Sequence, residues 1–273
     1  MKQYISYTIV EPSEANQEIL IALFDGFNFD GFEQTNTGLI ANALEGSIDE
    51  NAIERFLNDR KTVFTKSILP EENWNNKWES DFHPIVIDDF VAVRANFHEP
   101  ISNVQHEIII TPKMSFGTGH HATTWMMMKA MEQIDFTGKT VLDFGTGTGI
   151  LAILAEKMGA TKITAIDYDE WCINNSEENV AANNCNKISL FLADNLNAFE
   201  AVDVLLANIN RHILLEHLHA IASHVNKNGL LLLSGILVTD KEEMTEACLQ
   251  LGFQSPIFFE KNGWECIFLK KAA

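Results

Sequence analysis

Three glycines and an aspartate in the second half of the chain are the residues best placed to do chemistry. Gly145, Gly147 and Gly149 follow the apolar segment 140–144, and Asp167 closes a second apolar segment 22 positions after Gly145. A strand that ends in a glycine-rich turn and continues into a helix brings bare backbone close to a ligand, and a carboxylate about 20 residues later can hold two ribose hydroxyls. This pattern predicts a site for a nucleoside cofactor.

The spacing of the glycines indicates which cofactor is bound. A dinucleotide-binding turn has the spacing G-x-G-x-x-G, whereas this turn has G-x-G-x-G with Ile150 at the sixth position. The turn also lacks the lysine that a phosphate-binding loop requires. The spacing therefore favours S-adenosylmethionine (SAM) over NAD, although a glycine triplet alone is also typical of an ordinary tight turn.

Two further aspartates lie near the ends of predicted strands, and each has two interpretations. Asp143 can orient the glycine turn or bind the amino end of SAM through water, but a helix-capping role explains it equally well. Asp194 can reach the adenine amino group, or it is a solvated carboxylate at a strand end. Both alternatives stay open from the sequence.

Asn208 closes the apolar segment 203–207 and is the candidate catalytic residue. An asparagine carbonyl there can accept hydrogen bonds from an incoming amine and direct the nitrogen lone pair at the methyl group. Transfer from a sulfonium needs a deprotonated nucleophile, alignment and exclusion of water, so positioning does the catalysis. The alternative interpretation is an ordinary turn asparagine.

A second glycine-containing segment, residues 111–124, precedes the glycine turn and can fold over the cofactor. We expect Phe116 to act as an apolar lid, and Thr124 to cap the next helix while donating a hydrogen bond to the ligand. His120 and His121 are adjacent but have no third ligand nearby, so we expect no metal and assign them a loop-ordering role. The residues predicted to bind the cofactor are Phe116, Thr124, Gly145, Gly147, Asp167 and Asn208.

Length and charge restrict the class of protein. A chain of 273 residues is comfortable for two domains. Its 38 acidic and 19 basic residues give a formal charge of −19, which argues against a broad grip on nucleic acid phosphates and suits a basic partner. The acidity also fits a protein that needs only to stay soluble.

The cysteines and the apolar segments indicate the compartment. The four cysteines lie far apart without zinc-binding spacing, so we expect reduced thiols. No segment reaches the roughly 18 apolar residues of a membrane span, and we expect a cytoplasmic protein with no membrane contact.

The first 68 residues predict a small ferredoxin-like domain with β-α-β-β-α-β order. Such a domain is usually a binding platform, and the alternative is a structural cap on its neighbour. The predicted elements are a strand over 2–10, a helix over 13–24, extended pieces around Gly31 and Gly38, a helix capped by Ser47 or Asp49, and a strand over 61–64.

Residues 69–82 predict a helical linker. Trp74, Trp78 and Phe82 are spaced four apart and share one helix face. We assign these aromatic side chains to packing first and to substrate contact second.

Residues 83–273 predict an α/β domain. From residue 138 strands and helices alternate regularly, which indicates a parallel sheet, and Asn262-Gly263 is a strong hairpin signal near the end. A parallel sheet finished by an antiparallel hairpin is the seven-stranded, Rossmann-like plan of class I methyltransferases. The ligand is expected at the carboxyl ends of the first strands.

These motifs resemble the ribosomal protein L11 methyltransferase (PrmA) family. The resemblance runs from about residue 70 to the end, and residues 1–68 match only in layout. Its most specific part is the sequence Phe-Gly-Thr-Gly-His-His, whereas Asn-Ile-Asn at 208–210 lacks the prolines usual in amino-methylating enzymes. The matching segments are Glu72–Trp74, Trp78, Phe82–Pro84, Met114–Thr124, Val141–Ala152, Ala207–Ile209 and Ser234–Ile236.

The resemblance implies SAM-dependent methylation of lysine side chains and of the N-terminal α-amine of ribosomal protein L11. It implies SAM contacts at Thr124, Gly145, Asp167 and Asn208, and an N-terminal domain that docks the substrate. The alternatives are methylation of another protein or of a small molecule, a non-catalytic SAM-binding module, and, if the glycine spacing misleads, an NAD dehydrogenase.

Overall fold

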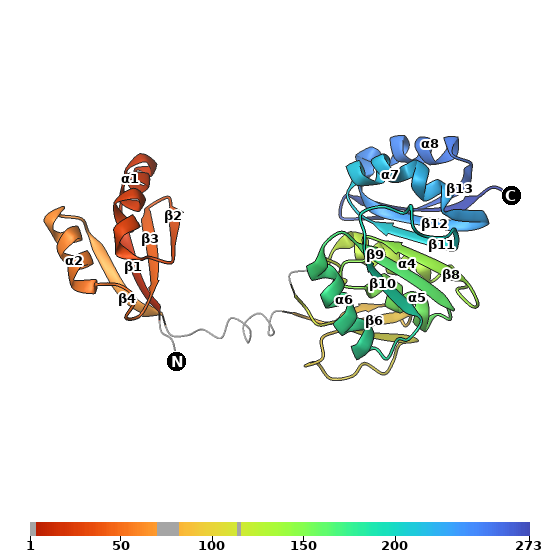
Figure 1. Cartoon of the computed structure of the whole chain (residues 1–273), viewed down its shortest axis with the longest axis horizontal. Coiled ribbons are helices and arrows are strands. Elements are labelled where there is room, and N and C mark those ends of the chain that lie inside the picture. The colour runs from red at the N-terminus through yellow and green to blue at the C-terminus, as the bar shows by residue number, and fades with distance from the viewer. Residues whose placement is uncertain (1–3, 70–81, 114–115) are drawn as a thin grey trace. The chain divides into compact units, whose positions relative to one another are not determined.

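A computed structural model of the chain describes residues 4–69, 82–113 and 116–273. The chain divides into two compact units, Met1–Phe82 and His83–Ala273 (Figure 1). The predicted helical linker, including Trp74 and Trp78, lies outside the described residues apart from Leu69 and Phe82.

The N-terminal unit is an antiparallel sheet in the order β2-β3-β1-β4, with two α-helices in the connections. This order of elements is the predicted ferredoxin-like one. The elements are β1 (Tyr4–Val10), α1 (Glu14–Phe24), the short 3-10 helix η1 (Asp25–Phe27), β2 (Gly31–Thr35), β3 (Gly38–Leu44), α2 (Glu50–Asp59) and β4 (Phe64–Leu69).

Local sequence explains where these elements begin and end. Ile5, Tyr7 and Ile9 alternate along β1 and are buried in the core of this unit. Asp49 caps α2 by accepting a hydrogen bond from the Ala52 amide at 3.0 Å, as one of the two predicted caps. The strand predicted over 61–64 instead begins at Phe64, because the backbone of Lys61 is left-handed (φ 55°) and closes α2.

The second unit contains a seven-stranded sheet in the order β10-β9-β8-β11-β12-β14-β13. The first five strands in this order are parallel, and β14 pairs antiparallel with both β12 and β13. The predicted α/β class, with a parallel sheet and a terminal hairpin at Asn262-Gly263, is confirmed. The elements of this sheet and its connections are β8 (Thr140–Phe144), α5 (Ile150–Lys157), β9 (Lys162–Asp167), α6 (Glu170–Ala182), β10 (Ile188–Leu192), β11 (Val202–Asn208), α7 (Arg211–Ser223), β12 (Val225–Leu237), the 3-10 helix η2 (Val238–Asp240), α8 (Lys241–Gln250), β13 (Phe253–Lys261) and β14 (Trp264–Lys271).

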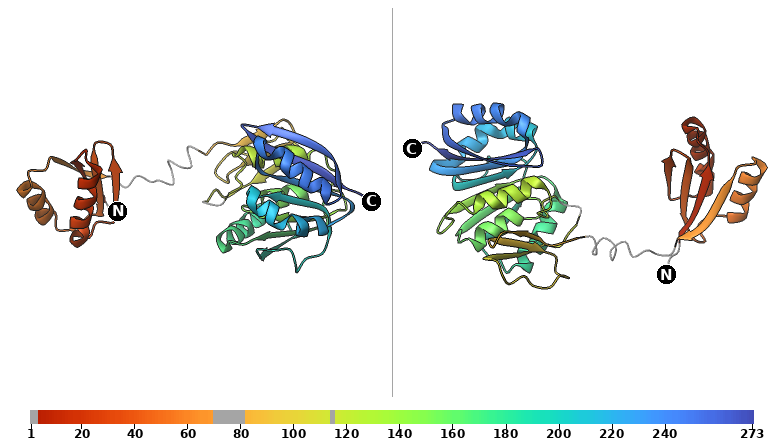
Figure 2. Two further views of the ribbon diagram at one scale, coloured as in Figure 1. Left: turned by 90° about the horizontal axis from the view of Figure 1, so that it is seen from above. Right: turned by 180° about the vertical axis from the view of Figure 1, so that it is seen from behind.

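Helices cover both faces of this sheet (Figure 2). Successive residues of a strand point to opposite faces, so Val141 of β8 joins the core beneath α4 (Ala122–Met131) and α5, whereas Leu142 joins the core beneath α7 and α8. The methionine run 126–128 is fully buried, as predicted for a helix core. Both faces are therefore apolar, and polar side chains collect at the strand ends.

A small three-stranded sheet before α4 was not predicted. It consists of β5 (Ile85–Ile87), β6 (Val91–Arg94) and β7 (His106–Ile109), in that order. Val91 and Ile108 pack into the same core as α4 and α5. This sheet therefore supports the helix layer next to the glycine turn.

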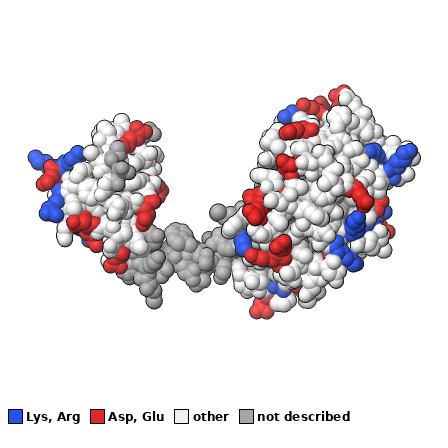
Figure 3. All heavy atoms as spheres, viewed as in Figure 1, with Lys and Arg blue, Asp and Glu red and all other residues white. Residues whose placement is uncertain are grey.

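No helix among the described residues is long and apolar enough to cross a membrane. On the face drawn in Figure 3, acidic side chains are spread over both units among basic ones. The excess of negative charge in the composition is thus not confined to one unit.

Candidate cofactor and acceptor site

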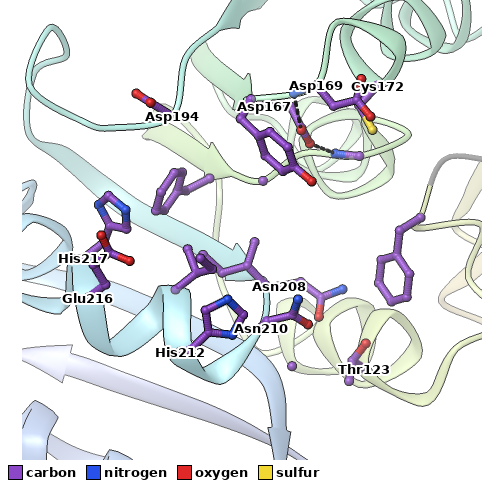
Figure 4. Close-up of a pocket in the computed structure, with 18 of the residues that line it drawn as sticks. Thr123, Asp167, Asp169, Cys172, Asp194, Asn208, Asn210, His212, Glu216 and His217 are labelled. Carbon is purple, nitrogen blue, oxygen red and sulfur yellow. Dashed lines mark hydrogen bonds between the residues drawn. The ribbon is translucent and has the colours of Figure 1, made fainter.

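The carboxyl ends of β8, β9 and β11 bring the predicted site residues to one edge of the sheet. Phe144 of β8 pairs with Ile166 of β9 and with Ala207 of β11, so the residues that follow them are neighbours. A cavity of about 760 Å³ opens at this edge (Figure 4). Among its lining residues are the predicted Phe116, Gly145, Gly147, Asp167, Asp194 and Asn208.

The glycine turn depends on two close approaches. The backbone is left-handed at Gly145 (φ 77°) and at Gly147 (φ 58°). A Cβ atom on Gly145 would lie 2.2 Å from Cγ2 of Ile209, and one on Gly147 would lie 2.4 Å from the carbonyl oxygen of Phe116. Only glycine fits at both positions without moving these neighbours.

The Asp167 carboxylate holds the glycine turn in place. The residue is only 6% exposed, its Oδ2 accepts a hydrogen bond from the Gly147 amide at 2.9 Å, and its Oδ1 accepts one from the Asp169 amide at 3.1 Å. Each carboxylate oxygen can accept a further hydrogen bond. Asp167 therefore orders the turn and retains capacity for a ligand, and its contact with ribose stays a prediction.

Asp143 lies beneath the turn rather than in the cavity. It is fully buried, and its Oδ2 accepts a hydrogen bond from Oγ1 of Thr146 at 2.6 Å. Burial raises the pKa of Asp143 to about 7, with a further upward contribution from the charge of Asp167. The hydrogen bond with Thr146 supports the turn-ordering interpretation, and a backbone hydrogen bond from Ala152, in the first turn of α5, leaves the capping interpretation open as well.

Asn208 and Thr124 form a pair at the end of β11. Nδ2 of Asn208 donates a hydrogen bond to Oγ1 of Thr124 at 3.2 Å. Oδ1 of Asn208 is buried, and no described residue donates a hydrogen bond to it. A buried carbonyl without a partner is costly, so this atom is a candidate ligand contact.

The predicted capping role of Thr124 is wrong. The N-cap of α4 is His121, whose side chain accepts a hydrogen bond from the Thr123 amide. Thr124 lies inside the first turn, is fully buried, and is not among the lining residues, whereas Thr123 is. The contact of Thr124 with the ligand stays a prediction. In the structure its hydroxyl accepts a hydrogen bond from Asn208.

The segment around Phe116 borders the cavity. Phe116 is 52% exposed, and its carbonyl oxygen accepts a hydrogen bond from the Thr148 amide at 3.1 Å. Its ring packs edge-on against His121 at 5.2 Å between centroids, and His121 packs against Trp264 at 4.9 Å. These three rings form one aromatic wall of the cavity, and the lid role of Phe116 stays a prediction.

His120 links the same segment to the start of the unit. Its Nε2 lies 3.0 Å from the His83 carbonyl oxygen, and its Nδ1 lies 3.2 Å from Oγ1 of Thr118. This arrangement supports the predicted loop-ordering role.

Asp194 lines the cavity from the loop after β10. Its side chain is exposed, and its Oδ1 accepts a hydrogen bond from Nδ2 of Asn195 at 2.7 Å. The predicted contact with the adenine amino group stays a prediction.

A row of polar residues on α6 supports the turn and was missed by sequence reasoning. Oγ of Ser176 donates to the Gly147 carbonyl at 2.8 Å, and Nδ2 of Asn179 donates to the Thr148 carbonyl at 2.8 Å. Oδ1 of Asn179 also accepts from the Thr111 amide at 2.7 Å. The signal was the repetition of asparagine every four residues on one helix face, at Asn175, Asn179 and Asn183.

A second missed feature is the wall formed by the start of α7. Asn210, His212, Glu216 and His217 line the cavity opposite the Asp167 and Asp194 side chains (Figure 4). The sequence signal for this wall was the group of polar residues that directly follows Asn208, in the first two turns of α7.

Gly235 completes this wall through a bulge in β12. The pairing of β12 with β14 shifts between Ser234 and Ile236, and the backbone of Gly235 is left-handed (φ 94°). A Cβ atom there would lie 2.1 Å from the Ile209 carbonyl oxygen. The bulge therefore lets β12 approach the turn between β11 and α7.

The residues present fit a nucleoside cofactor such as SAM. The volume of about 760 Å³ lies within the range of small-molecule sites. Because Gly145 and Gly147 have no side chains, a ligand can approach the backbone of the turn closely. The carboxylate of Asp167 can accept further hydrogen bonds from a ligand. Oδ1 of Asn208 lies in the opposite wall without a protein partner, and the predicted contact of Asn208 with SAM stays a prediction.

Comparison with known proteins places the chain among methyltransferases. The family model described as ribosomal protein L11 methyltransferase (PrmA) matches residues 8–272. The chain is 36% identical over 271 residues to the ribosomal protein L11 methyltransferase of Phocaeicola vulgatus, covering 96% of both chains. It is 38% identical to that of Porphyromonas gingivalis over 266 residues, covering 93% of this chain and 90% of the relative.

The crystal structure of a ribosomal protein L11 methylase from Lactobacillus delbrueckii subsp. bulgaricus is similar with a TM-score of 0.65 and 29% identity. The match covers 70% of this chain and 100% of the methylase chain. A methyltransferase from Pyrococcus furiosus, at 19% identity and a TM-score of 0.52, shares the fold. The chain therefore belongs to the ribosomal protein L11 methyltransferase (PrmA) family, whose cofactor is SAM.

Proposed function

We propose that this chain is a SAM-dependent N-methyltransferase that modifies lysine side chains and the N-terminal α-amine of ribosomal protein L11. Family membership supports the reaction, and the names of the relatives support the substrate. The formal charge of −19 suits a basic ribosomal protein. We also propose a cytoplasmic location, which a ribosomal substrate supports, and no direct recognition of nucleic acid or membrane.

The buried, unpartnered Oδ1 of Asn208 is the observation that carries this proposal. An amine nucleophile offers N–H donors, which a carbonyl oxygen can accept. The Thr124 hydroxyl accepts a hydrogen bond from Nδ2 of Asn208, which fixes the amide and leaves Oδ1 as its unpartnered end. Asn208 is therefore proposed as the residue that positions the amine.

SAM supplies a methyl group on a sulfonium, which a neutral amine can attack directly. The rest of the catalytic effect is positioning by this chain. The glycine turn and Asp167 hold the cofactor side, Asn208 orients the amine through an N–H···O hydrogen bond, and Phe116 helps to exclude water. A variant that lacks one of these groups is therefore expected to impair one step: cofactor binding, alignment of the amine, or exclusion of water.

The decisive experiment incubates purified L11 with the purified chain and SAM, and follows the mass of L11 and of its peptides. Stepwise addition of methyl groups to lysines and to the N-terminus supports the proposal. An unchanged mass, with SAM bound, would favour another protein or a small molecule as the substrate. The Asn208→Ala variant separates catalysis from binding, because a non-catalytic SAM-binding module would show no turnover in either form.

We further propose that residues 1–68 recognise the substrate and that residues 69–82 link this domain to the methyltransferase domain, residues 83–273. A linker that lets one active site visit several amines must have sufficient length. Shortening residues 69–82 should then abolish some methylations before others, as read from peptide masses. Equal loss at all sites would count against the linker role without affecting the proposed reaction.

A further inference from the structure

The acidic side chains of the cavity and two of its histidines lie on two opposite walls. Asp167, Asp169 and Asp194 belong to the ends of β9 and β10, whereas His212, Glu216 and His217 belong to α7, the helix that follows Asn208. In Figure 4 the His212 side chain points into the cavity on the same side as Asn208 and Asn210. The amine-positioning residue thus shares its wall with an imidazole.

Three histidines line the cavity, and two of them already have partners. His121 caps α4 and packs between Phe116 and Trp264. His217 packs edge-on against Phe144 at 5.3 Å between ring centroids. His212 is exposed, and none of the described residues forms a hydrogen bond or ring contact with its imidazole. Its two nitrogens are free to exchange protons with a substrate and with water.

The proposed reaction needs a proton acceptor. A lysine amine has an ordinary pKa of about 10.4 and an α-amine one of about 7.7 to 8.0. Lysine therefore enters as an ammonium, which has no lone pair for attack, and once enclosed it is cut off from bulk water. Imidazole is the side chain that is commonly neutral at pH 7 and able to take up a proton.

We propose that His212 accepts the proton that the substrate ammonium loses before methylation, and passes it to water. This inference rests on the proposed amine methylation. An N–H bond of the ammonium breaks as one forms on an imidazole nitrogen, and the imidazolium then releases its proton to solvent at the exposed side. The neutral amine forms its N–C bond with the methyl group as the S–C bond breaks, and the positive charge moves from sulfur to nitrogen.

Charged and titratable groups lie near His212 on α7 and across the cavity. Glu216 follows His212 by four residues and lines the same wall, so its carboxylate lies one helical turn away. Asp167, Asp169 and Asp194 face it across the cavity with negative charge, together with Tyr168, Cys172 and His121. The neighbouring cation, Arg211, is paired with Asp240 and Glu243 at the start of α8, where Lys241 approaches Glu265.

The test compares His212→Gln with wild type on purified L11 and SAM, and scores each amine by peptide mass. At pH 7.5 we expect lysine methylation to fall roughly 100-fold. Methylation of the α-amine should fall by less than about threefold, because about a third of it is already neutral at this pH. The lysine deficit should shrink as the pH rises toward 9.5, and the dissociation constant of SAM should stay within about twofold of wild type.

His219→Gln is the matched control, because His219 is exposed on the same helix but does not line the cavity. It should methylate both classes of amine at the wild-type rate. Wild-type lysine methylation by His212→Gln would overturn the inference, and so would an equal loss for lysine and α-amine at every pH, which indicates a structural role. Failure of the wild-type chain to methylate L11 would instead overturn the proposed function and this inference with it.

Discussion

The two walls of the cavity differ in how far their polar groups are already satisfied. On the glycine wall, the Gly147 amide, its carbonyl and the Asp167 carboxylate all have hydrogen-bond partners within the protein. On the opposite wall, Oδ1 of Asn208 and the imidazole of His212 have none among the described residues. The first wall is fixed before any ligand arrives, and the second offers groups for a ligand to complete.

This difference has an energetic basis. An unsatisfied buried carbonyl costs about 1 to 3 kcal/mol, whereas a satisfied network of buried groups gives a rigid, unique geometry. The chain tolerates this cost at Asn208 and at Oδ1 of Asp143 beneath the turn, but avoids it at Gly147 and Asp167 themselves. We therefore expect changes in the glycine wall to reduce cofactor affinity, and changes in the opposite wall to reduce turnover at constant affinity.

The largest expected effect is on SAM binding by Gly147→Ala. The added Cβ would lie 2.4 Å from the Phe116 carbonyl oxygen, so the turn or the segment around Phe116 must shift. Adding a methyl group to a closely packed site costs about 1 to 3 kcal/mol, so the SAM dissociation constant should rise by up to about 100-fold in calorimetry.

Gly138→Ala is the control for backbone strain. Gly138 is also left-handed (φ 75°), but an added Cβ there would meet no atom within 4 Å. This variant should lose about 1 kcal/mol of stability and keep its SAM affinity. Equal affinity loss in both variants would show that strain, and not the approach of Phe116, decides binding.

Asn208→Ala tests the opposite wall, which Asn208 and the start of α7 form. Loss of the Oδ1 acceptor is expected to lower kcat by about 100-fold, because the amine is no longer aligned, while the dissociation constant of SAM changes little. Steady-state kinetics on L11 combined with calorimetry separates the two quantities. A large loss of SAM affinity with kcat retained would assign Asn208 to the cofactor and contradict the division between the walls.

Asp143→Asn probes the foundation of the glycine wall through its pH dependence. The pKa of Asp143 in the folded protein is about 7, above the ordinary 3.8, so the folded state holds the proton more tightly and stability falls as the pH rises from about 4 to 7. The variant should lose this unfavourable contribution and be more stable than wild type at pH 8, by up to about 4 kcal/mol in denaturant unfolding.

Asp203→Asn should shift stability in the opposite direction. The backbone hydrogen bond from Thr140 holds the pKa of Asp203 below its ordinary value, so its stabilising contribution is present at neutral pH and is lost as the pH falls. This variant should therefore be less stable than wild type at pH 7. For Asp143→Asn, by contrast, a variant less stable than wild type at pH 8 would contradict the argument that burial raises the pKa of Asp143.

The smallest expected effect is that of Thr124→Val, which keeps the shape but removes the acceptor for Nδ2 of Asn208. A lost hydrogen bond of about 1 kcal/mol predicts a fall in kcat of roughly fivefold with unchanged SAM affinity. The comparison with Asn208→Ala shows how much of that residue's effect depends on its orientation. An unchanged kcat would indicate that Asn208 is held by its backbone alone.

Local sequence patterns were sufficient to predict most of the helices and strands of the second unit, residues 83–273. Apolar runs bounded by turn residues predicted β8, β9 and β11, and Asn262-Gly263 predicted the hairpin, because strand periodicity and left-handed turns depend on neighbours in sequence. Once the strands are known to be parallel, their carboxyl ends must meet at one edge. The proximity of Gly145, Asp167 and Asn208 followed from the sequence for that reason.

Other features were decided by contacts between distant segments. The hydrogen bond between Asn208 and Thr124 joins residues 84 positions apart, and that between Ser176 and Gly147 joins residues 29 apart. The small sheet over 85–109 and the bulge at Gly235 likewise depend on packing against other elements. Periodicity carries no information about such pairs.

The sequence by itself determined that a glycine turn, a carboxylate and an asparagine would share one edge of a parallel sheet. Only the tertiary structure decided which of their polar atoms have protein partners and which remain available, and it placed the wall of α7, which includes Asn208, opposite the glycine turn and the carboxylate. The physical reason is that strand direction is set by local pattern and short connections, whereas the satisfaction of a buried polar group depends on every segment that packs around it.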